Sequence, residues 1–133
     1  MRVLALDYGS ARCGCALSDP TGTLATPIEA VQRPGTRRGR ARLAALVRER
    51  EVGRVVVGLP LGLSGEDTEQ TREARAFAAQ LEEVVGVPVS LYDERFTTRI
   101  AERSGSRTTS EDSRAAAVLL EDWLARHGSE VAP

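Results

Sequence analysis

Residues 2–10 read RVLALDYGS, a short apolar run that ends in a single acid, Asp7. Such a run is long enough for one buried strand and too short for a stable helix. A carboxylate at the end of a buried strand is costly unless it is paired or binds a cation. The glycine at position 9 permits close approach of a ligand to the backbone. We therefore interpret Asp7 as the centre of a functional site, with the capping of a turn as the alternative role.

Length and composition indicate one globular domain. The chain has 133 residues, of which 41% are hydrophobic. This suits a single core across residues 1–133, with 128–133 as a tail. No apolar run approaches the roughly 20 residues of a membrane span, and no signal-peptide pattern is visible. We expect a cytoplasmic protein without membrane contact. We also expect Cys13 and Cys15 to be core residues, because they share one strand face and no second pair completes a zinc site.

The charge is nearly balanced overall but unevenly placed. The net charge is −1, so the whole molecule is not a polycation. All 18 basic residues are arginine, however, and seven of them lie between Arg33 and Arg50. This cluster is either a patch that binds the phosphates of nucleic acid or the solvated face of a helix.

The hydrophobic pattern predicts three short strands, followed by helices that alternate with strands. We place strands near 2–7, 13–18, 24–31, 55–59 and 87–92, and helices from Thr36 to about 53, at 68–85 and from 110 or 111 to about 126. Three strands joined by short turns form an antiparallel meander, and the alternation adds two parallel strands. The predicted fold class is therefore α/β: a single domain with a mixed five-stranded sheet and helices on both faces.

The second helix and the turns give two local predictions. The helix should bury one apolar face, made of Ala74, Phe77, Ala78, Leu81 and Val84. The acids Asp19 and Asp67 lie in turn-forming sequence, so we expect each of them to cap a turn or a helix.

Three acids are predicted to meet at one edge of the sheet. Asp7 ends the first strand and Glu94 directly follows the last one. In open α/β sheets, sites form beyond the carboxyl ends of parallel strands. Asp112 shares a helical face with Ala116 and Leu119, so packing of that face carries Asp112 toward the sheet. Its alternative role is to complement the helix dipole.

Three carboxylates in one pocket require a counter-charge. The only histidine is His127, so the ligands are oxygen atoms, which indicates a hard cation, Mg²⁺ or Mn²⁺. Such ions promote displacement at phosphorus by activating water and neutralising the leaving oxygen. The sequence leaves open whether one ion or two are bound.

Four stretches resemble, in order, the motifs of the YqgF/RuvX family. They are LDYGSARCG at 6–14, VGLP at 57–60 with Gly65, YDERFTT at 92–98, and DSRAA at 112–116. The resemblance implies the ribonuclease-H-like fold of Holliday-junction resolvases. It also implies a nuclease linked to processing of the 5′ end of precursor 16S ribosomal RNA, with DNA as a possible further substrate. It assigns Asp7, Glu94 and Asp112 as catalytic, metal-binding acids, and it implies nucleic-acid contacts by Arg12, Arg95 and Thr97.

Two features depart from the family pattern. The family usually has an asparagine in the loop after Gly-Leu-Pro, where this chain has Gly62, so any side-chain contact there is lost. Many members carry a long basic segment before the final acid, whereas this chain has only Arg103 and Arg107 there. The second departure concerns substrate binding more than it concerns catalysis.

Three alternative functions fit parts of the pattern. A Holliday-junction resolvase in DNA recombination would normally act as a symmetric dimer, and the sequence leaves open whether the chain is a monomer or a homodimer. A non-catalytic nucleic-acid-binding module would retain the acids as relics. An ATPase or sugar kinase of the actin-like superfold also opens with Asp-x-Gly, but it needs two such domains around a nucleotide, and 133 residues supply one.

Overall fold

The computed structural model describes residues 1–94 and 113–127. Its strands are β1 (Arg2–Asp7), β2 (Arg12–Ser18), β3 (Ala25–Gln32), β4 (Val52–Leu59) and β5 (Val89–Asp93). Its helices are α1 (Arg37–Glu49), α2 (Glu69–Val85) and α5 (Arg114–His127). Every strand predicted from the sequence is present, with bounds shifted by no more than a few residues. The predicted start of the last helix at 110 or 111 lies outside the described residues.

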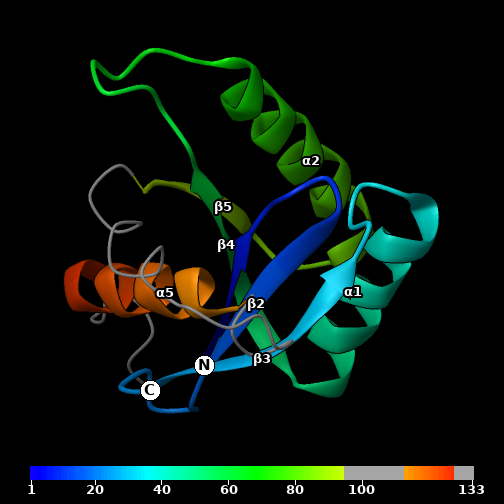
Figure 1. Ribbon diagram of the computed structural model, residues 1–133. Coiled ribbons are helices and arrows are strands. Elements are labelled where there is room, and N and C mark those ends of the chain that lie inside the picture. The colour runs from blue at the N-terminus through cyan, green and yellow to red at the C-terminus, as the bar shows by residue number, and fades with distance from the viewer. Residues whose placement is uncertain (95–112, 128–133) are drawn as a thin grey trace.

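The five strands form one mixed sheet in the order β3-β2-β1-β4-β5. β1 pairs antiparallel with β2, and β2 pairs antiparallel with β3, which confirms the predicted meander. β4 lies parallel to both β1 and β5, because each of these connections passes through a helix. The carboxyl ends of β1, β4 and β5 therefore meet at one edge of the sheet, as Figure 1 shows.

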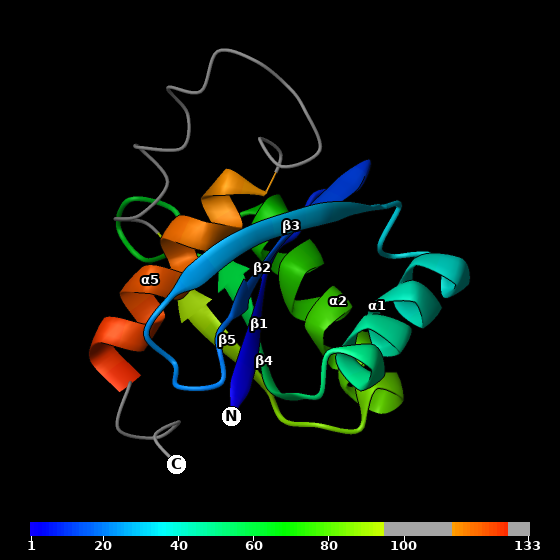
Figure 2. The ribbon, with the colours of Figure 1, turned by 90° about the horizontal axis from the view of Figure 1, so that it is seen from below.

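Helices cover both faces of the sheet, as predicted. Figure 2 shows α1 and α2 on one side and α5 on the other. Side chains alternate along each strand, so Leu4 and Leu6 of β1 pack toward α1 and α2, whereas Val3 and Ala5 pack toward α5. Two apolar cores result, one on each face.

The end of β3 and the start of α1 are held tightly together. The side chain of Thr36 accepts a hydrogen bond from the backbone N–H of Gly39, so Thr36 is the predicted N-cap. A side chain at Gly39 would clash with the carbonyl oxygen of Arg33. Glycine at this position therefore lets the first turn of α1 lie directly against the turn that leaves β3.

The structure corrects two local predictions for α2. Thr68, not Asp67, is the N-cap, and it forms a capping box with Thr71. Asp67 instead forms a two-bonded ion pair with Arg75, at 3.0 and 3.1 Å. Val84 is 46% exposed, and Val85 takes the predicted place of Val84 in the core because it lies one full turn after Leu81.

The remaining local predictions are confirmed. Cys13 and Cys15 are buried, free and part of the core on the α1 face. The carboxylate of Asp19 accepts hydrogen bonds from the backbone N–H groups of Thr23 and Leu24, so it closes the turn between β2 and β3. Within residues 1–94 and 113–127, no helix is long and apolar enough to cross a membrane.

Candidate active site

Asp7 lies at the carboxyl end of the central strand. It is paired with Gly14 of β2, and the parallel register of Leu6 with Val57 places it beside Gly58 of β4. Strand alternation directs its side chain toward the α5 face. Burial raises the pKa of Asp7 from 3.8 to about 6. None of the basic side chains that the structure describes forms an ion pair with it, so its negative charge is uncompensated by this part of the chain.

Glu94 follows β5 and turns back over β4. Its backbone N–H donates to the carbonyl oxygen of Leu59 at 3.3 Å, and the residue is only 6% exposed. A side chain at Gly58 would clash with Oε2 of Glu94 and would lie 3.1 Å from Cδ2 of Leu119. The Glu94 carboxylate therefore occupies the space between β4 and α5 that the missing side chain of Gly58 leaves.

The two acids interact with each other. The pKa of Glu94 is raised from 4.5 to about 8, first by burial and then by repulsion from Asp7 and Asp93. Like charges that share a buried site disfavour ionisation of each other. The structure thus brings Asp7 and Glu94 to one edge and couples them electrostatically, which is the arrangement of a site that binds a cation or transfers protons.

Ser113 holds the start of α5 beside this edge. Its hydroxyl accepts a hydrogen bond from the N–H of Cys15 at 3.0 Å and donates to the carbonyl oxygen of Ile28 at 2.5 Å. The ladder between β2 and β3 is irregular between Cys13 and Cys15, and the serine satisfies the groups that this irregularity frees. Cys15 follows Gly14, the partner of Asp7, so residue 113 is anchored close to the acid pair.

The turn between β1 and β2 completes the described part of the edge. A side chain at Gly9 would come within 2.7 Å of the carbonyl oxygen of Arg12, so glycine allows this tight turn. Arg12 is exposed at the start of β2, at the same edge as Asp7. Tyr8 points to the opposite face of the sheet and stacks on Phe77, with ring centroids 4.5 Å apart. It therefore fixes the strand that carries Asp7.

Several residues predicted for the site lie outside the described residues. They are Asp112, Arg95 and Thr97. Within residues 1–94 and 113–127, no group of three or more His, Cys, Asp or Glu side chains could hold a metal ion. The described site therefore consists of the pair Asp7 and Glu94, and the role of Asp112 stays a prediction.

Sequence reasoning assigned no role to Gly58 or Ser113. Both carried a signal. Gly58 interrupts a β-branched run, and an isolated glycine in a strand often marks the close approach of another group. Ser113 lies on the apolar stripe of the last helix with Ala117, Leu120 and Leu124, where a polar residue needs a partner.

Comparison with known proteins agrees with this geometry. The sequence model of the family described as "RuvX: Holliday junction resolvase" matches residues 1–126. This chain belongs to the RuvX family. A relative in Maridesulfovibrio salexigens, named "Putative pre-16S rRNA nuclease", is 41% identical over 95% of this chain and 99% of its own length. A protein with the same name in Mycobacteroides abscessus is 44% identical over 97% of this chain and 86% of its own.

Solved structures confirm the ribonuclease-H-like fold predicted for this RuvX-family chain. RuvC from Thermus thermophilus superposes with a TM-score of 0.61 at 17% identity, over 96% of this chain and 97% of RuvC. The fowlpox virus resolvase, solved with Holliday-junction DNA, gives a TM-score of 0.51 at 12% identity, over 93% and 99% of the two chains. At these identities the likeness concerns the fold alone.

Proposed function

We propose that this RuvX-family chain is a divalent-metal-dependent nuclease that processes the 5′ end of precursor 16S rRNA in the cytoplasm. The observation that carries the proposal is a pair of adjacent carboxylates at the carboxyl ends of the parallel strands, the partly buried Asp7 and the buried Glu94, each with a raised pKa. Two mutually repelling acids in a buried site weaken the fold, so their presence needs a chemical reason. Hydrolysis of a phosphodiester supplies one.

The acid pair fits a hard divalent cation such as Mg²⁺ or Mn²⁺. Carboxylate oxygens are the ligands that these ions prefer, and a cation relieves both the burial penalty of Asp7 and its repulsion with Glu94. Asp7 and Glu94 would hold the ion, with Asp112 as the proposed third ligand. The ion, when bound, supplies activation of water and neutralisation of charge at phosphorus.

The substrate assignment rests on the relatives. The two relatives that are 41% and 44% identical to this chain carry names that give pre-16S rRNA as the substrate. The description of the family instead names Holliday junctions. We favour the rRNA substrate because the named relatives cover nearly the whole chain at high identity. Cleavage of a four-way DNA junction is the second candidate, and the family description is the observation in its favour.

Comparison of the wild-type protein with Asp7→Asn tests the proposal. Both are incubated with a precursor 16S fragment, single-stranded RNA and DNA, and a four-way junction, in Mg²⁺, Mn²⁺ or EDTA. We expect metal-dependent cleavage by the wild type. In the variant we expect a loss on the order of 1000-fold, because a group that stabilises charge at the reacting centre is removed.

The variant should fold at least as well as the wild type, since it removes a buried charge. Preference for the precursor RNA over the junction would support the first candidate, and the reverse preference would support the second. Folded wild-type protein that binds nucleic acid but cleaves none of these substrates in either metal would overturn the nuclease and leave a binding module.

A further inference from the structure

The segment that contains α1 carries a concentrated, uncompensated positive charge. Residues 33–51 hold seven arginines but only two acids, Glu49 and Glu51. Arg40 donates to the carbonyl oxygen of Gly35 and to Gln80, and Arg42 approaches Glu49 at 3.9 Å. The other guanidinium groups have no hydrogen bond or ion pair to any residue that the structure describes; they belong to Arg33, Arg37, Arg38, Arg48 and Arg50. These five charges therefore form no ion pair within residues 1–94 and 113–127.

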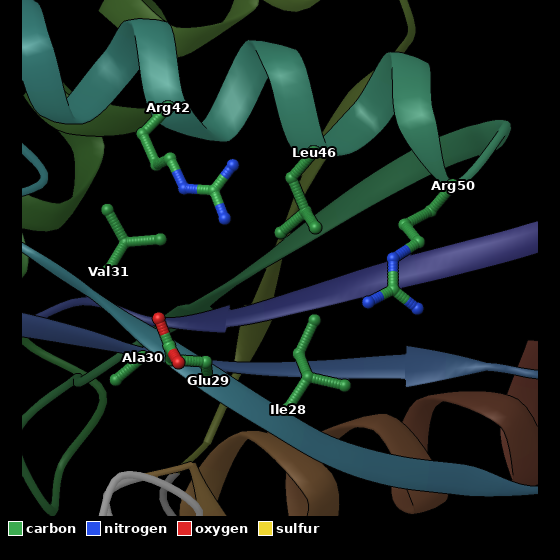
Figure 3. Close-up of a pocket in the computed structure, with 7 residues that line it drawn as sticks. All are labelled: Ile28, Glu29, Ala30, Val31, Arg42, Leu46 and Arg50. Carbon is green, nitrogen blue, oxygen red and sulfur yellow. The ribbon is translucent and has the colours of Figure 1, made fainter.

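Two of these arginines line a cleft between α1 and the edge strand β3. Figure 3 shows Arg42, Leu46 and Arg50 extending from α1 toward β3. The cleft has a volume of about 180 Å³, and its opposite wall is formed by residues 28–31 of β3. It therefore combines an apolar floor, made of Leu46 and Ile28, with a guanidinium group toward each end.

The cleft lies at the same height along the strands as the acid pair, but beside the edge strand β3 and not at the central strand β1. Ile28 and Val31 of β3 pair with Cys15 and Cys13, and Gly14 between these two cysteines pairs with Asp7. Two strand spacings separate β3 from β1, which is about 10 Å. The acids face α5 and the cleft faces α1, so a ligand that reaches both must pass over the start of β2 and the end of β3.

Exposed arginines lie along that passage. Arg12 begins β2 and pairs with Gln32 at the end of β3, and Arg33 follows directly, its N–H bonded to the carbonyl oxygen of Ala11. Both side chains are exposed. A basic path thus runs from the edge that carries Asp7, past Arg12 and Arg33, into the cleft with Arg42 and Arg50.

We propose that the cleft between α1 and β3 binds the phosphodiester backbone of the nucleic-acid substrate, with Arg42 and Arg50 contacting phosphates. This inference rests on the proposed nuclease function and names a binding surface away from the acids. Arg42 and Arg50 are eight residues apart, which is roughly 12 Å along a helix. On one strand of a duplex, with a phosphate about every 3.4 Å of axis, that distance spans three to four phosphates.

Glu29 makes the proposal sharper. It is an exposed acid in the wall opposite the two arginines. A carboxylate there repels a phosphate backbone, so its removal should strengthen binding while the removal of an arginine weakens it. A solvated helix face without a ligand predicts no effect from either change.

Equilibrium binding measured across a salt series tests the cleft independently of cleavage. All proteins carry Asp7→Asn, so no substrate is cut, and fluorescence anisotropy follows labelled single-stranded RNA, duplex RNA and single-stranded DNA. The variants are R42A/R50A, E29Q and R48A. Arg48 is the matched control, because it lies on the same helix, roughly 200° around the axis from Leu46 and outside the cleft, and its guanidinium has no partner among the described residues.

We expect R42A/R50A to weaken binding at least tenfold at low salt. The plot of log affinity against log salt has a negative slope. On single strands the magnitude of this slope should decrease by about 1.4, since each lost phosphate contact removes about 0.7. E29Q should bind about twofold to threefold more tightly by loss of a repulsive charge, and R48A should bind like the parent. The three nucleic acids show whether the cleft prefers RNA, DNA or a duplex.

Equal losses of affinity in R42A/R50A and R48A would overturn the proposed cleft. They would indicate that positive charge spread over the whole helix attracts the nucleic acid. Unchanged binding and salt slope in R42A/R50A, in protein with an unaltered melting temperature, would also overturn the proposed cleft. These outcomes are distinct from a failure of the proposed function, in which protein with Asp7 intact fails to cleave any substrate. Normal cleavage by the wild-type protein, together with unaltered binding by R42A/R50A in the Asp7→Asn background, would remove this inference alone.

Discussion

On the α5 face of the sheet the charged groups of the candidate site are acids with little exposure, the partly buried Asp7 and the buried Glu94, whereas on the α1 face the cleft carries exposed arginines. Glu94 is 6% exposed and has a pKa near 8, and burial raises the pKa of Asp7 to about 6. The side chain of Arg42 is 55% exposed, and Arg50 is exposed as well. The acid pair therefore costs the fold stability, which the proposed cation would restore, while the arginines cost the fold little.

This difference suits two separate tasks. A reacting centre must hold charges in fixed positions and keep water out, which requires burial. A surface that attracts a long polyanion needs many accessible charges and little precision. Changes on the α5 face should therefore affect catalysis and stability together, and changes on the α1 face should affect binding and its salt dependence.

Gly58→Ala should break the acid side of this comparison, with an effect on cleavage second only to that of Asp7→Asn. The added methyl group clashes with Oε2 of Glu94, so the carboxylate must leave its place between β4 and α5. We expect metal-dependent cleavage to fall roughly 100-fold, as when a group that orients a metal ligand is lost. We also expect the free energy of unfolding to fall by about 1–3 kcal/mol through overpacking. Cleavage assays and thermal melting measure the two effects.

Gly53→Ala is the matched control on the same strand. The three atoms nearest to a side chain at Gly53 all belong to the flexible side chain of Met1, which can move aside, so this variant should melt and cleave nearly like the wild type. If Gly58→Ala cleaves as well as Gly53→Ala does, the position of Glu94 over β4 is unnecessary for activity.

Glu94→Gln should sharpen the comparison through pH. The folded pKa of Glu94, about 8, lies above its ordinary value of 4.5, so the folded protein holds a proton that the unfolded chain releases. The stability that this proton provides is fully present below about pH 4.5 and is lost as pH rises to about 8. Without metal, the free energy of unfolding should decrease as pH rises from about 4.5 to about 8. The decrease should be on the order of 3 kcal/mol larger in the wild type than in Glu94→Gln. Denaturant titrations at pH 5 and pH 8.5 measure this difference.

Removal of the arginines gives the contrasting control for this pH effect. R42A/R50A should follow the wild-type pH dependence, because both arginines line the cleft on the α1 face and their removal leaves the surroundings of Glu94 unchanged. Saturating Mg²⁺ should raise the free energy of unfolding of the wild-type protein at pH 8.5 toward its value at pH 5, since the ion would neutralise the repelling acids. A wild-type protein whose stability matches that of Glu94→Gln at both pH values would show that burial does not perturb this acid.

The sequence predicted most of the fold because its signals are local. The apolar run in β1, the β-branched run in β4 and the Thr36 cap each appear within a few residues. The errors have the same origin. Asp67 and Thr68 are adjacent and both are able to cap, and Val84 and Val85 differ by one rotation of 100° on the helix. Choosing between such neighbours depends on contacts with Arg75 and with the core, which are not local.

For the site, the sequence predicted that Asp7 and Glu94 lie close together but not how the chain holds them, and the predicted third acid, Asp112, lies outside the described residues. Asp7 and Glu94 could be placed at one edge from strand direction alone. The contact of Glu94 with Gly58 depends on the register of β4 and on a turn after β5, and neither can be read from periodicity. The same holds for the irregular pairing near Cys15 that Ser113 satisfies.

Ser113→Ala should have the smallest effect on activity, and it tests the bond that joins the two sides. The hydroxyl of Ser113 links the start of α5 on the acid side to Ile28 of β3, which lines the arginine cleft. Its loss leaves the N–H of Cys15 and the carbonyl oxygen of Ile28 without this partner, at a cost of about 1–3 kcal/mol in unfolding free energy. We expect cleavage to fall by roughly threefold to tenfold, in the lower range for residues that support a site indirectly.

Ser18→Ala separates the structural effect from the functional one. Ser18, like Ser113, is a buried serine, and it lies at the end of β2 far from Asp7. Its hydroxyl accepts a hydrogen bond from the N–H of Val3 at 2.8 Å. The two variants should therefore lose similar stability, as measured by denaturant unfolding. Only Ser113→Ala should lose cleavage at a temperature where both remain folded. Equal activity in the two would mean that anchoring α5 beside Gly14 supports the fold and not the acid pair, because loss of a comparable bond elsewhere in the sheet would then have the same consequence.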